Sequence, residues 1–252
     1  MKLKVLILAL LCVSFAKAQE TWEVGSTTLT EYDLVTGVQI PWEIMWGPDD
    51  YIWATERRGR VLRINPADGN YTTVLNIQSI ISGGGSGEPG LLGMAADPNF
   101  DESPYIYLVF NYGGFPYSER ISRFMWNGTA LVDEEILIDD IDGGGIHNGA
   151  RMLVLEDNTL MVTMGDKGIG DNSQNMNNLD GKTLRLNLDG SIPADNPNPS
   201  SYIYSYGHRN SQGLCLGPNG LIYSSEHGQN SNDEFNIIEP DRNYGWPEVE
   251  GM

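Results

Sequence analysis

The chain has 252 residues, and its 34 acidic against 15 basic side chains give a formal net charge of -19 at pH 7. This charge argues against nucleic acid or an anionic membrane surface as a partner, because either would repel the protein. The composition is 40% hydrophobic with 30 glycines, which supplies a core and many tight turns and favours an all-β fold over a helical bundle.

The N-terminus has the pattern of a secretory signal peptide. Two lysines precede an apolar run from Val5 to Phe15, and a small-x-small site ends at Ala18, where cleavage is expected. The run holds 11 residues, too few to cross a bilayer, which needs about 20. Residues 1–18 are therefore predicted to be removed, and residues 19–252 to act in the periplasm or outside the cell without membrane insertion.

A turn followed by a short strand with alternating apolar residues recurs along the mature chain. Residues 46–56 and 216–226 align position by position without a gap, and weaker copies begin at Asp97 and Glu156. A second strand with the same alternation is predicted after each copy, at residues 60–64, 120–124, 182–188 and 233–238. No stretch shows a convincing helical period.

The copies of this repeat are 50, 58 and 62 residues apart, which suits a sheet of four strands with its connections. Units of this size repeated around an axis form a β-propeller, which needs about 4 to 8 of them. The sequence therefore predicts one all-β propeller domain in which four blades are visible. The alternative is a β-sandwich whose turns are similar by accident.

Cys215 is the one cysteine outside the predicted signal peptide, so no internal disulfide can form. Its sequence neighbours Leu214 and Leu216 are both apolar. They predict a thiol that is buried in the core rather than a reactive one.

Three loops carry side chains that are suited to chemistry. The first, residues 143–151, is rich in glycine, which lets backbone approach a ligand closely and exposes His147. An imidazole titrates near neutral pH and can act as a general base. Asp166 follows the next predicted strand, and adjacent strands of one blade would bring its carboxylate back to the imidazole. A structural role is the alternative for a single loop histidine.

The second loop, residues 206–213, places Arg209, Asn210 and Gln212 within four residues. The rigid fork of an arginine suits a planar, oxygen-rich anion, and its amide neighbours suggest a side chain reserved for a ligand. An ion pair between blades is the alternative. The third loop, residues 226–234, is rich in oxygen ligands that suit calcium, although its spacing is not that of an EF-hand.

Six segments resemble the soluble glucose/sorbosone dehydrogenase family, the aldose sugar dehydrogenases that use pyrroloquinoline quinone (PQQ) and have a six-bladed propeller. They are GLLGMAADPNF (90–100), IHNGARMLV (146–154), GKTLRLNLDGSIPADNP (181–197), YSYGHRNSQGL (204–214), SSEHGQNSNDEFNIIEP (224–240) and RNYGWP (242–247). They occur in the family's order over most of residues 38–250, and together they are far more specific than any one of them alone.

The resemblance implies a reaction and the residues that perform it. His147 would remove the proton from the anomeric hydroxyl of an aldose while hydride passes from that carbon to PQQ, and Asp166 would support the imidazole. Arg209 and Asn210 would contact the quinone oxygens and stabilise negative charge there. Gln212 would hold a carboxylate of the cofactor.

The resemblance also implies two calcium sites. The main-chain carbonyls of Gly228 and Gln229 would help to hold the calcium that bridges to PQQ. Glu234, together with the carbonyl of Tyr244, matches a second, structural calcium site. Glu88 lies where the family has a polar residue near PQQ.

Two positions and the length depart from the family pattern. Ile146 stands where a carboxylate often lies beside the histidine, and Gln229 replaces a common proline. At a mean spacing of roughly 57 residues, six blades need about 340 residues, against 234 after the predicted cleavage. We therefore expect a fragment or a truncated reading frame with about four of six blades, whose open edge strands are exposed to pairing.

The function expected from these observations is that of an exported quinoprotein that oxidises aldoses to lactones with PQQ and Ca²⁺. The sequence does not identify the sugar or the electron acceptor, and it leaves a homodimer open. One alternative is a calcium-dependent propeller lactonase, which would use carboxylate and asparagine ligands around a catalytic metal. The other is a propeller that has become a binding module without catalysis.

Overall fold

The computed structural model describes residues 20–80 and 87–251. The predicted signal peptide, residues 1–18, lies outside these residues. The chain forms two compact units, which are divided after Thr36. In the first unit, β1 (Thr21–Val24) and β2 (Thr27–Thr30) pair as an antiparallel hairpin. Within the described residues, no helix is long and apolar enough to cross a membrane.

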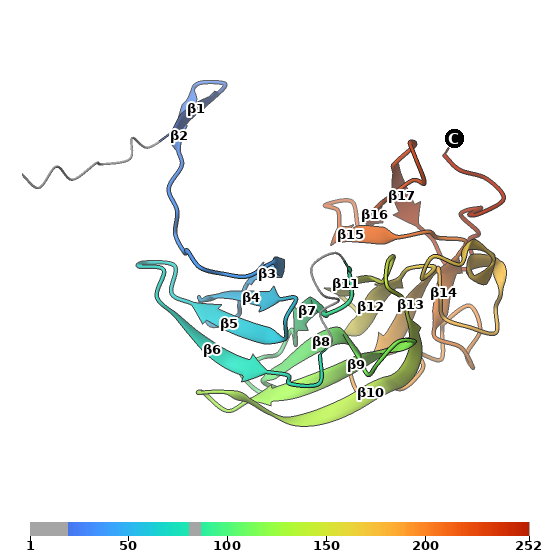
Figure 1. The fold of residues 1–252 in the computed structure, drawn as a ribbon, viewed down its shortest axis with the longest axis horizontal. Helices are drawn as coiled ribbons and strands as arrows, with labels where there is room; N and C mark the ends of the chain where they lie inside the picture. The colour runs from blue at the N-terminus through green and yellow to red at the C-terminus, as the bar shows by residue number, and fades with distance from the viewer. Residues whose placement is uncertain (1–19, 81–86, 252) are drawn as a thin grey trace, which may run out of the picture. The chain divides into compact units, whose positions relative to one another are not determined.

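The described part of the second unit contains four antiparallel sheets, each built from strands that follow one another in the chain (Figure 1). The first sheet holds β3 (Pro41–Trp46), β4 (Ile52–Glu56), β5 (Arg60–Ile64) and β6 (Tyr71–Asn76). The second holds β7 (Leu91–Ala96), β8 (Tyr105–Tyr112), β9 (Tyr117–Trp126) and β10 (Leu131–Gly143). The third holds β11 (Gly149–Val154), β12 (Thr159–Met164), β13 (Lys182–Asn187) and β14 (Ile203–Tyr206), and the fourth holds β15 (Ser211–Leu216), β16 (Ile222–Glu226) and β17 (Glu234–Ile238).

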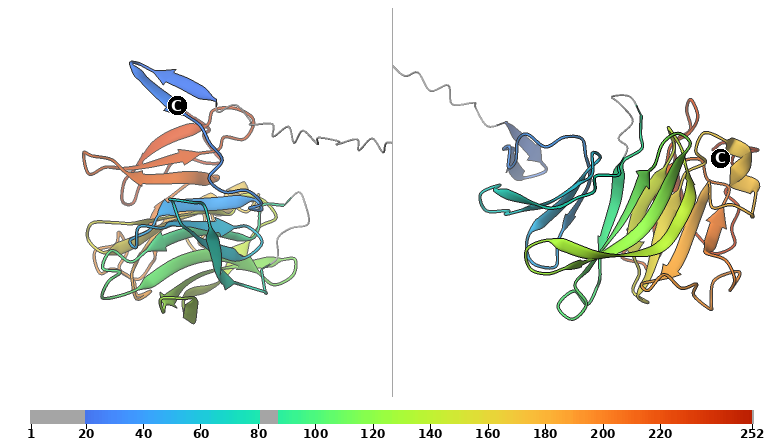
Figure 2. Two further views of the ribbon diagram at one scale, coloured as in Figure 1. Left: turned by 90° about the vertical axis from the view of Figure 1, so that its left-hand side faces the viewer. Right: turned by 60° about the horizontal axis from the view of Figure 1, so that its bottom comes forward.

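The four sheets follow one another around an arc, as blades of a propeller do (Figures 1 and 2). Their first strands β3, β7, β11 and β15 contact one another in this order and form the inner edge of the arc. A short 3₁₀ helix, η1 (Gly170–Gln174), interrupts the connection between β12 and β13. The prediction of an all-β propeller with about four blades is confirmed, and the β-sandwich alternative is wrong because the strands form four sheets and not two.

The sequence repeat corresponds to a structural repeat. β4 in the first blade and β16 in the fourth occupy the same five positions of the two gapless copies. The four second strands predicted after the copies are observed as β5, β9, β13 and β17, with ends that differ by at most a few residues. Period-two alternation therefore identified these strands correctly.

The second sheet has one face in each of two different cores. On β8, Ile106, Leu108 and Phe110 belong to the core shared with the first sheet, whereas Tyr107 and Val109 belong to the core shared with the third. Successive side chains of a strand point to opposite faces, so one strand supplies both cores. Burial on both sides explains why these strands are almost continuously apolar.

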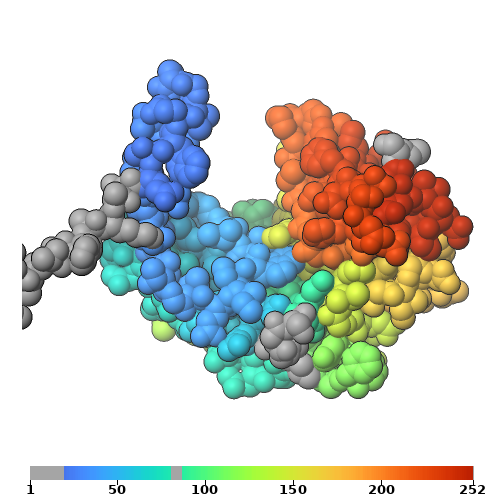
Figure 3. Space-filling view, turned by 45° about the horizontal axis from the view of Figure 1, so that its top comes forward, coloured from blue at the N-terminus to red at the C-terminus, as the bar shows by residue number. Residues whose placement is uncertain are grey.

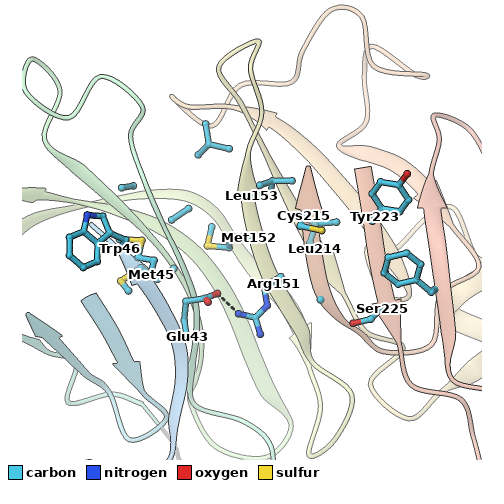
Figure 4. A pocket seen from close by; sticks show the side chains of 16 residues that line it. Glu43, Met45, Trp46, Arg151, Met152, Leu153, Leu214, Cys215, Tyr223 and Ser225 are labelled. Atoms are coloured by element: carbon cyan, nitrogen blue, oxygen red, sulfur yellow. Dashed lines mark hydrogen bonds and ion pairs between the residues drawn. The ribbon is translucent and has the colours of Figure 1, made fainter. Parts of the chain in front are cut away.

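The prediction of a buried thiol at position 215 is wrong, because Cys215 is exposed. Its neighbours Leu214 and Leu216 pack against the core between the third and fourth sheets. Alternation along β15 turns the thiol to the opposite face, where it lines a cavity of about 600 Å³ along the inner strands (Figure 4). This inner cavity is lined mainly by apolar side chains and is crossed by an ion pair of Glu43 with Arg151.

Each inner strand has a register shift close to its first residue. The shifts lie between Pro41 and Ile44, Leu91 and Met94, Gly149 and Met152, and Ser211 and Gly213. Bulges bend a strand and redirect its side chains, and they are frequent beside functional sites. The repeated shift makes the end of the sheets at which the inner strands begin a candidate for the functional site.

The two-sided core gives a prediction for stability. Leu160 on β12 is fully buried, whereas Leu221, just before β16, is 41% exposed. We expect Leu160→Ala to lower the free energy of unfolding by about 2 to 5 kcal/mol because it leaves a cavity. The matched change Leu221→Ala should cost less than about 1 kcal/mol. Chemical denaturation of both variants measures the difference, and equal losses would contradict the packing described.

Candidate functional site

Loops from different blades meet at the end where the inner strands begin. One cavity of about 180 Å³ is lined by residues at the start of all four inner strands, among them Trp42, Leu92, Gly149 and Gln212. β11 starts opposite the end of β12, and β15 starts opposite the end of β16, because these pairs are antiparallel. The connections that precede β11 and β15 and those that follow β12 and β16 therefore share this end, and all three loops singled out in the sequence lie there.

The structure brings the imidazole of His147 and the carboxylate of Asp166 together. The Nδ1 atom of His147 lies 2.7 Å from Oδ1 of Asp166, as expected for residues at the ends of adjacent strands. The aspartate side chain is 2% exposed and that of the histidine 14%. A carboxylate that holds Nδ1–H orients the ring and leaves Nε2 to accept a proton from a ligand.

The backbone around His147 is fixed by close approach of the neighbouring loop. His147 has a φ of 54°, in the left-handed region that non-glycine residues seldom adopt. Its carbonyl oxygen accepts a hydrogen bond from the backbone N–H of Lys167 at 3.2 Å. A Cβ atom on Gly165 would lie 1.9 Å from the same oxygen, so only glycine fits there. The strained histidine is thus held by the segment after β12, which also carries Asp166.

Buried polar side chains hold the glycine-rich loop, residues 143–151, through hydrogen bonds. The carboxamide oxygen of Asn148 accepts hydrogen bonds from Gly144 N at 2.9 Å and from Asn111 Nδ2 at 3.1 Å. The ammonium group of Lys167 pairs with Glu119 in a buried ion pair and also donates to the Asn148 carbonyl at 3.2 Å. Apart from Oε1 of Glu119, which is buried without a partner, these buried polar groups bond to one another, and such a network favours one loop conformation.

Glu88 contacts the same loop from the connection before β7. Its Oε2 accepts a hydrogen bond from the backbone N–H of His147 at 2.5 Å, and its own N–H donates to Gly145 O at 3.1 Å. Its side chain lines the cavity at the start of the inner strands. The residue predicted to lie near a cofactor is therefore placed beside His147, where it also supports the histidine's backbone.

Arg209 has few partners of its own. Its Nη1 donates to the carbonyl oxygen of His227 at 3.1 Å, and its guanidinium carbon lies 5.6 Å from the ring centroid of Trp246. No ion pair among the described residues involves Arg209, and its Nε is buried without a partner. The alternative of an ion pair between blades is therefore not supported, and donor groups are left for an anion.

Asn210 and Gln212 line the shared cavity. The side-chain oxygen of Asn210 accepts hydrogen bonds from Gly149 N at 3.1 Å and from Gln212 Nε2 at 2.9 Å. The bond from Gly149 connects the fourth blade to the third at the point where both inner strands begin. The Asn210 oxygen is thus engaged within the protein, and the Asn210 amide group is the part left to donate to a ligand.

Glu226, which the sequence did not single out, holds the loop that carries Arg209. Its carboxylate accepts hydrogen bonds from the backbone N–H of Arg209 and from Ser211 Oγ, and it pairs with Nδ1 of the fully buried His208 at 2.9 Å. Burial alone would raise the pKa of Glu226, but His208 and these donors outweigh it and leave the pKa lowered. The carboxylate is therefore ionised and structural.

The first blade contains the same arrangement. Glu56, the equivalent of Glu226 in the gapless repeat, accepts a hydrogen bond from the backbone N–H of Gln39 at 2.6 Å. Gln39 is the equivalent of Arg209. The glutamate that ends both copies of the repeat was thus a signal, available in the sequence, for a residue that fixes the loop before the inner strand.

The four residues predicted to bind calcium fall into two places. Gly228 and Gln229 lie on the loop after β16, where Gly228 N donates to Asp233 Oδ1 at 3.0 Å. Glu234 and Tyr244 line a separate cavity of about 610 Å³. Asp233 also lines this cavity, so the two pairs lie close to one another, and calcium binding at either stays a prediction. In the part of the chain that the structure describes, no group of three or more His, Cys, Asp or Glu side chains is placed to hold a metal.

Trp246 is the residue at this end that sequence reasoning missed most clearly. Its indole Nε1 donates to Oδ2 of Asp166 at 2.8 Å, although 80 residues separate the two. The segment that carries it packs on η1, where Gln174 Nε2 donates to Asn243 Oδ1 at 3.0 Å. Figure 3 shows this red C-terminal segment against the yellow connection of the third blade. Its motif RNYGWP was noted in the sequence, but nothing local indicated a partner.

Comparison with known proteins gives one consistent family. Residues 38–252 match the model of the Glucose / Sorbosone dehydrogenase family. The chain is 36% identical to Quinoprotein glucose dehydrogenase B of Acinetobacter calcoaceticus over 94% of its own length and 55% of that protein. It is 28% identical to Aldose sugar dehydrogenase YliI of Escherichia coli, with 96% of this chain and 66% of that protein covered.

A solved structure is similar over the same region. The PQQ-bound aldose sugar dehydrogenase of Streptomyces coelicolor superposes with a TM-score of 0.81 at 34% identity, covering 86% of this chain and 65% of that one. The chain thus spans between about half and two thirds of the length of the two curated relatives and of this solved structure.

The role of Glu226 predicts a loss of stability on substitution. Glu226→Gln should lower the free energy of unfolding by about 1 to 3 kcal/mol, because it weakens the bonds to His208 and to the Arg209 backbone. Glu239→Gln, in an exposed pair with Arg242, is the matched control and should change it by less than about 1 kcal/mol. Thermal unfolding at pH 7 measures both.

The difference in stability between wild type and Glu226→Gln should depend on pH. Because the folded-state pKa of Glu226 is lowered, its contribution is present above the unfolded value of 4.5 and is lost as pH falls through the folded value. The gap between wild type and Glu226→Gln should therefore narrow below pH 4.5. A gap that widens on acidification would show that the carboxylate is not ionised in the folded protein.

Proposed function

Because the chain belongs to the glucose/sorbosone dehydrogenase family, we propose that it is an exported quinoprotein that oxidises an aldose at the anomeric carbon to a lactone. The observation that carries the proposal is the meeting, at one end of the blades, of the His147–Asp166 pair with an arginine whose guanidinium has no acidic partner and donates only to the carbonyl of His227 among the described residues. The first group can take a proton and the second can receive an anion.

The side chains at this end fit PQQ, a planar anion that bears quinone and carboxylate oxygens. Arg209 and Arg57 each have a buried Nε without a partner, and Arg57 lines the cavity together with Asn210 and Gln212. Arginine forks and amide groups are the donors that recognise such oxygens. Buried donors without partners cost free energy unless a ligand or water satisfies them, which supports an anionic ligand here.

The protein's own contribution to the reaction follows from the geometry. Oxidation of the sugar removes a proton from the anomeric hydroxyl and a hydride from its carbon. Nε2 of His147 takes the proton, and Asp166 stabilises the imidazolium through Nδ1. When bound, PQQ supplies the two-electron acceptor for the hydride. Arg209 donates toward the developing negative charge, and a donor that is fixed in advance needs no reorganisation.

Calcium is part of the proposal as well. The carbonyls of Gly228 and Gln229 would hold the ion beside the cofactor, and Glu234 with the Tyr244 carbonyl would hold the structural ion. Hard oxygen donors of this kind suit Ca²⁺. The lactonase alternative calls for carboxylates around a catalytic metal. At this end Asp166, Glu88 and Glu226 bond to protein groups, and no three acidic or metal-binding side chains of the described residues are grouped to hold a metal. Membership of a sugar dehydrogenase family supports a small sugar as the substrate, and a separate electron acceptor must reoxidise the cofactor.

The proposal is tested by reconstitution. We expect the protein, incubated with PQQ and Ca²⁺, to reduce an artificial electron acceptor dye in the presence of at least one aldose from a panel of hexoses, pentoses and disaccharides. Protein without PQQ is the control. Absence of dye reduction with every sugar, together with an unchanged PQQ spectrum on mixing with protein, would overturn the dehydrogenase assignment.

The role of His147 gives a sharper prediction. His147→Ala and His147→Gln should lower kcat at least about 10²- to 10⁴-fold, because the general base is lost. Binding of PQQ, followed by quenching of tryptophan fluorescence, should change less than about threefold because the donors on Arg209 and Asn210 remain. If both variants lose PQQ binding, or keep turnover, His147 is not the base.

A further inference from the structure

One carboxylate at the site is held on both of its oxygens. Oδ1 of Asp166 lies 2.7 Å from His147 Nδ1 and accepts a hydrogen bond from Gly168 N at 2.8 Å, while Oδ2 accepts the indole N–H of Trp246 at 2.8 Å. Two bonds on one oxygen still allow the carboxylate plane to turn. The indole on the other oxygen fixes that plane, and with it the direction from which Oδ1 meets the imidazole.

Trp246 is itself held firmly. Its backbone N–H donates to Gly207 O at 3.0 Å, and its carbonyl accepts from Gln174 Nε2 at 2.6 Å. A Cβ atom on Gly170 would lie 3.4 Å from the indole nitrogen and 3.0 Å from Pro247, so the ring packs closely on η1. The indole thus reaches Asp166 from a segment anchored to two different connections.

The same ring contacts the arginine of the site. The guanidinium carbon of Arg209 lies 5.6 Å from the ring centroid, within the range of a cation–π contact. One side chain therefore touches both the carboxylate that supports His147 and the cation proposed for the quinone. No other described residue is recorded in contact with both Asp166 and Arg209 through its side chain.

We infer that Trp246 is a positioning residue that fixes the Asp166 carboxylate and thereby keeps the proton of His147 on Nδ1, so that Nε2 is free to accept one. The part of the inference that concerns turnover rests on the proposed function. The part that concerns the tautomer does not. The other charged groups around the His147–Asp166 pair are Glu88, which contacts the His147 backbone, Lys167 with Glu119 behind the loop, and Arg209, whose carbonyl accepts a hydrogen bond from Asp166 N at 2.8 Å.

The chain offers a matched control for this role. Trp53 Nε1 donates to Asp49 Oδ1 at 2.9 Å, the same indole–carboxylate bond as that of Trp246, but in the core of the first blade. Asp49 also pairs with Arg63, and it has no hydrogen bond or ion pair with a histidine among the residues that the structure describes. Trp53→Phe therefore removes the same type of bond without touching the proposed site.

The test compares Trp246→Phe and Trp53→Phe by nitrogen-15 NMR of the histidine rings in protein without PQQ or sugar. In wild type and Trp53→Phe we expect neutral His147 to be almost entirely the Nδ1–H tautomer. In Trp246→Phe we expect a mixture of tautomers and at least about tenfold faster solvent exchange of the Nδ1 proton. An unchanged tautomer and exchange rate in Trp246→Phe, or the same change in both variants, would overturn the inference.

Two further measurements test the same contact, one in the wild-type protein and one in the enzyme loaded with PQQ. If Trp246→Phe does not fold, the indole N–H resonance of Trp246 in wild type must shift with the protonation of the His147–Asp166 pair, and a resonance that ignores pH would overturn the contact. In enzyme loaded with PQQ, Trp246→Phe should lower kcat about 10- to 100-fold with PQQ affinity changed less than about threefold. An altered tautomer in a protein without dehydrogenase activity would support the positioning role and count against the proposed function alone.

Discussion

A buried glutamate at the end of a blade's second strand is the constraint on which the site depends. In the fourth blade Glu226 binds the backbone of Arg209 and the ring of His208, and in the first blade Glu56 binds the backbone of Gln39. In both blades the carboxylate accepts a hydrogen bond from a backbone N–H just before the inner strand. No helix or sheet hydrogen bond is available to that N–H group. The same glutamate–backbone hydrogen bond thus recurs in two blades, and in the fourth blade it holds the backbone of Arg209.

The site combines rigid backbone with donors that the protein leaves free. His147 is held in a left-handed conformation by Gly165 and Lys167, and its ring is oriented by Asp166. Arg209 lies in a chain with a large excess of acidic residues, yet no described carboxylate pairs with its guanidinium. In so acidic a protein, an arginine without an acidic partner keeps guanidinium donors that suit an anion better than a neutral ligand, which is why we propose an anionic cofactor here.

Much of this could be predicted from the sequence, and the failures have physical causes. Period-two alternation located the strands, and the adjacency of strands within a blade led to the contact of His147 with Asp166. The buried thiol was wrongly predicted from the apolar neighbours of Cys215, because in a strand a residue and its neighbours point to opposite faces. The bond of Trp246 to Asp166 joins segments 80 residues apart, so no local pattern could indicate it.

The central claim is that loops from separate blades form one quinone site beside His147. The most direct test is a crystal structure of the protein grown with PQQ and Ca²⁺. The account predicts the cofactor at the start of the inner strands, with its oxygens in hydrogen-bond contact with Arg209 and Asn210 and with Nε2 of His147 facing its ring. A cofactor bound instead in the apolar inner cavity between Glu43 and Cys215, away from His147, would contradict it.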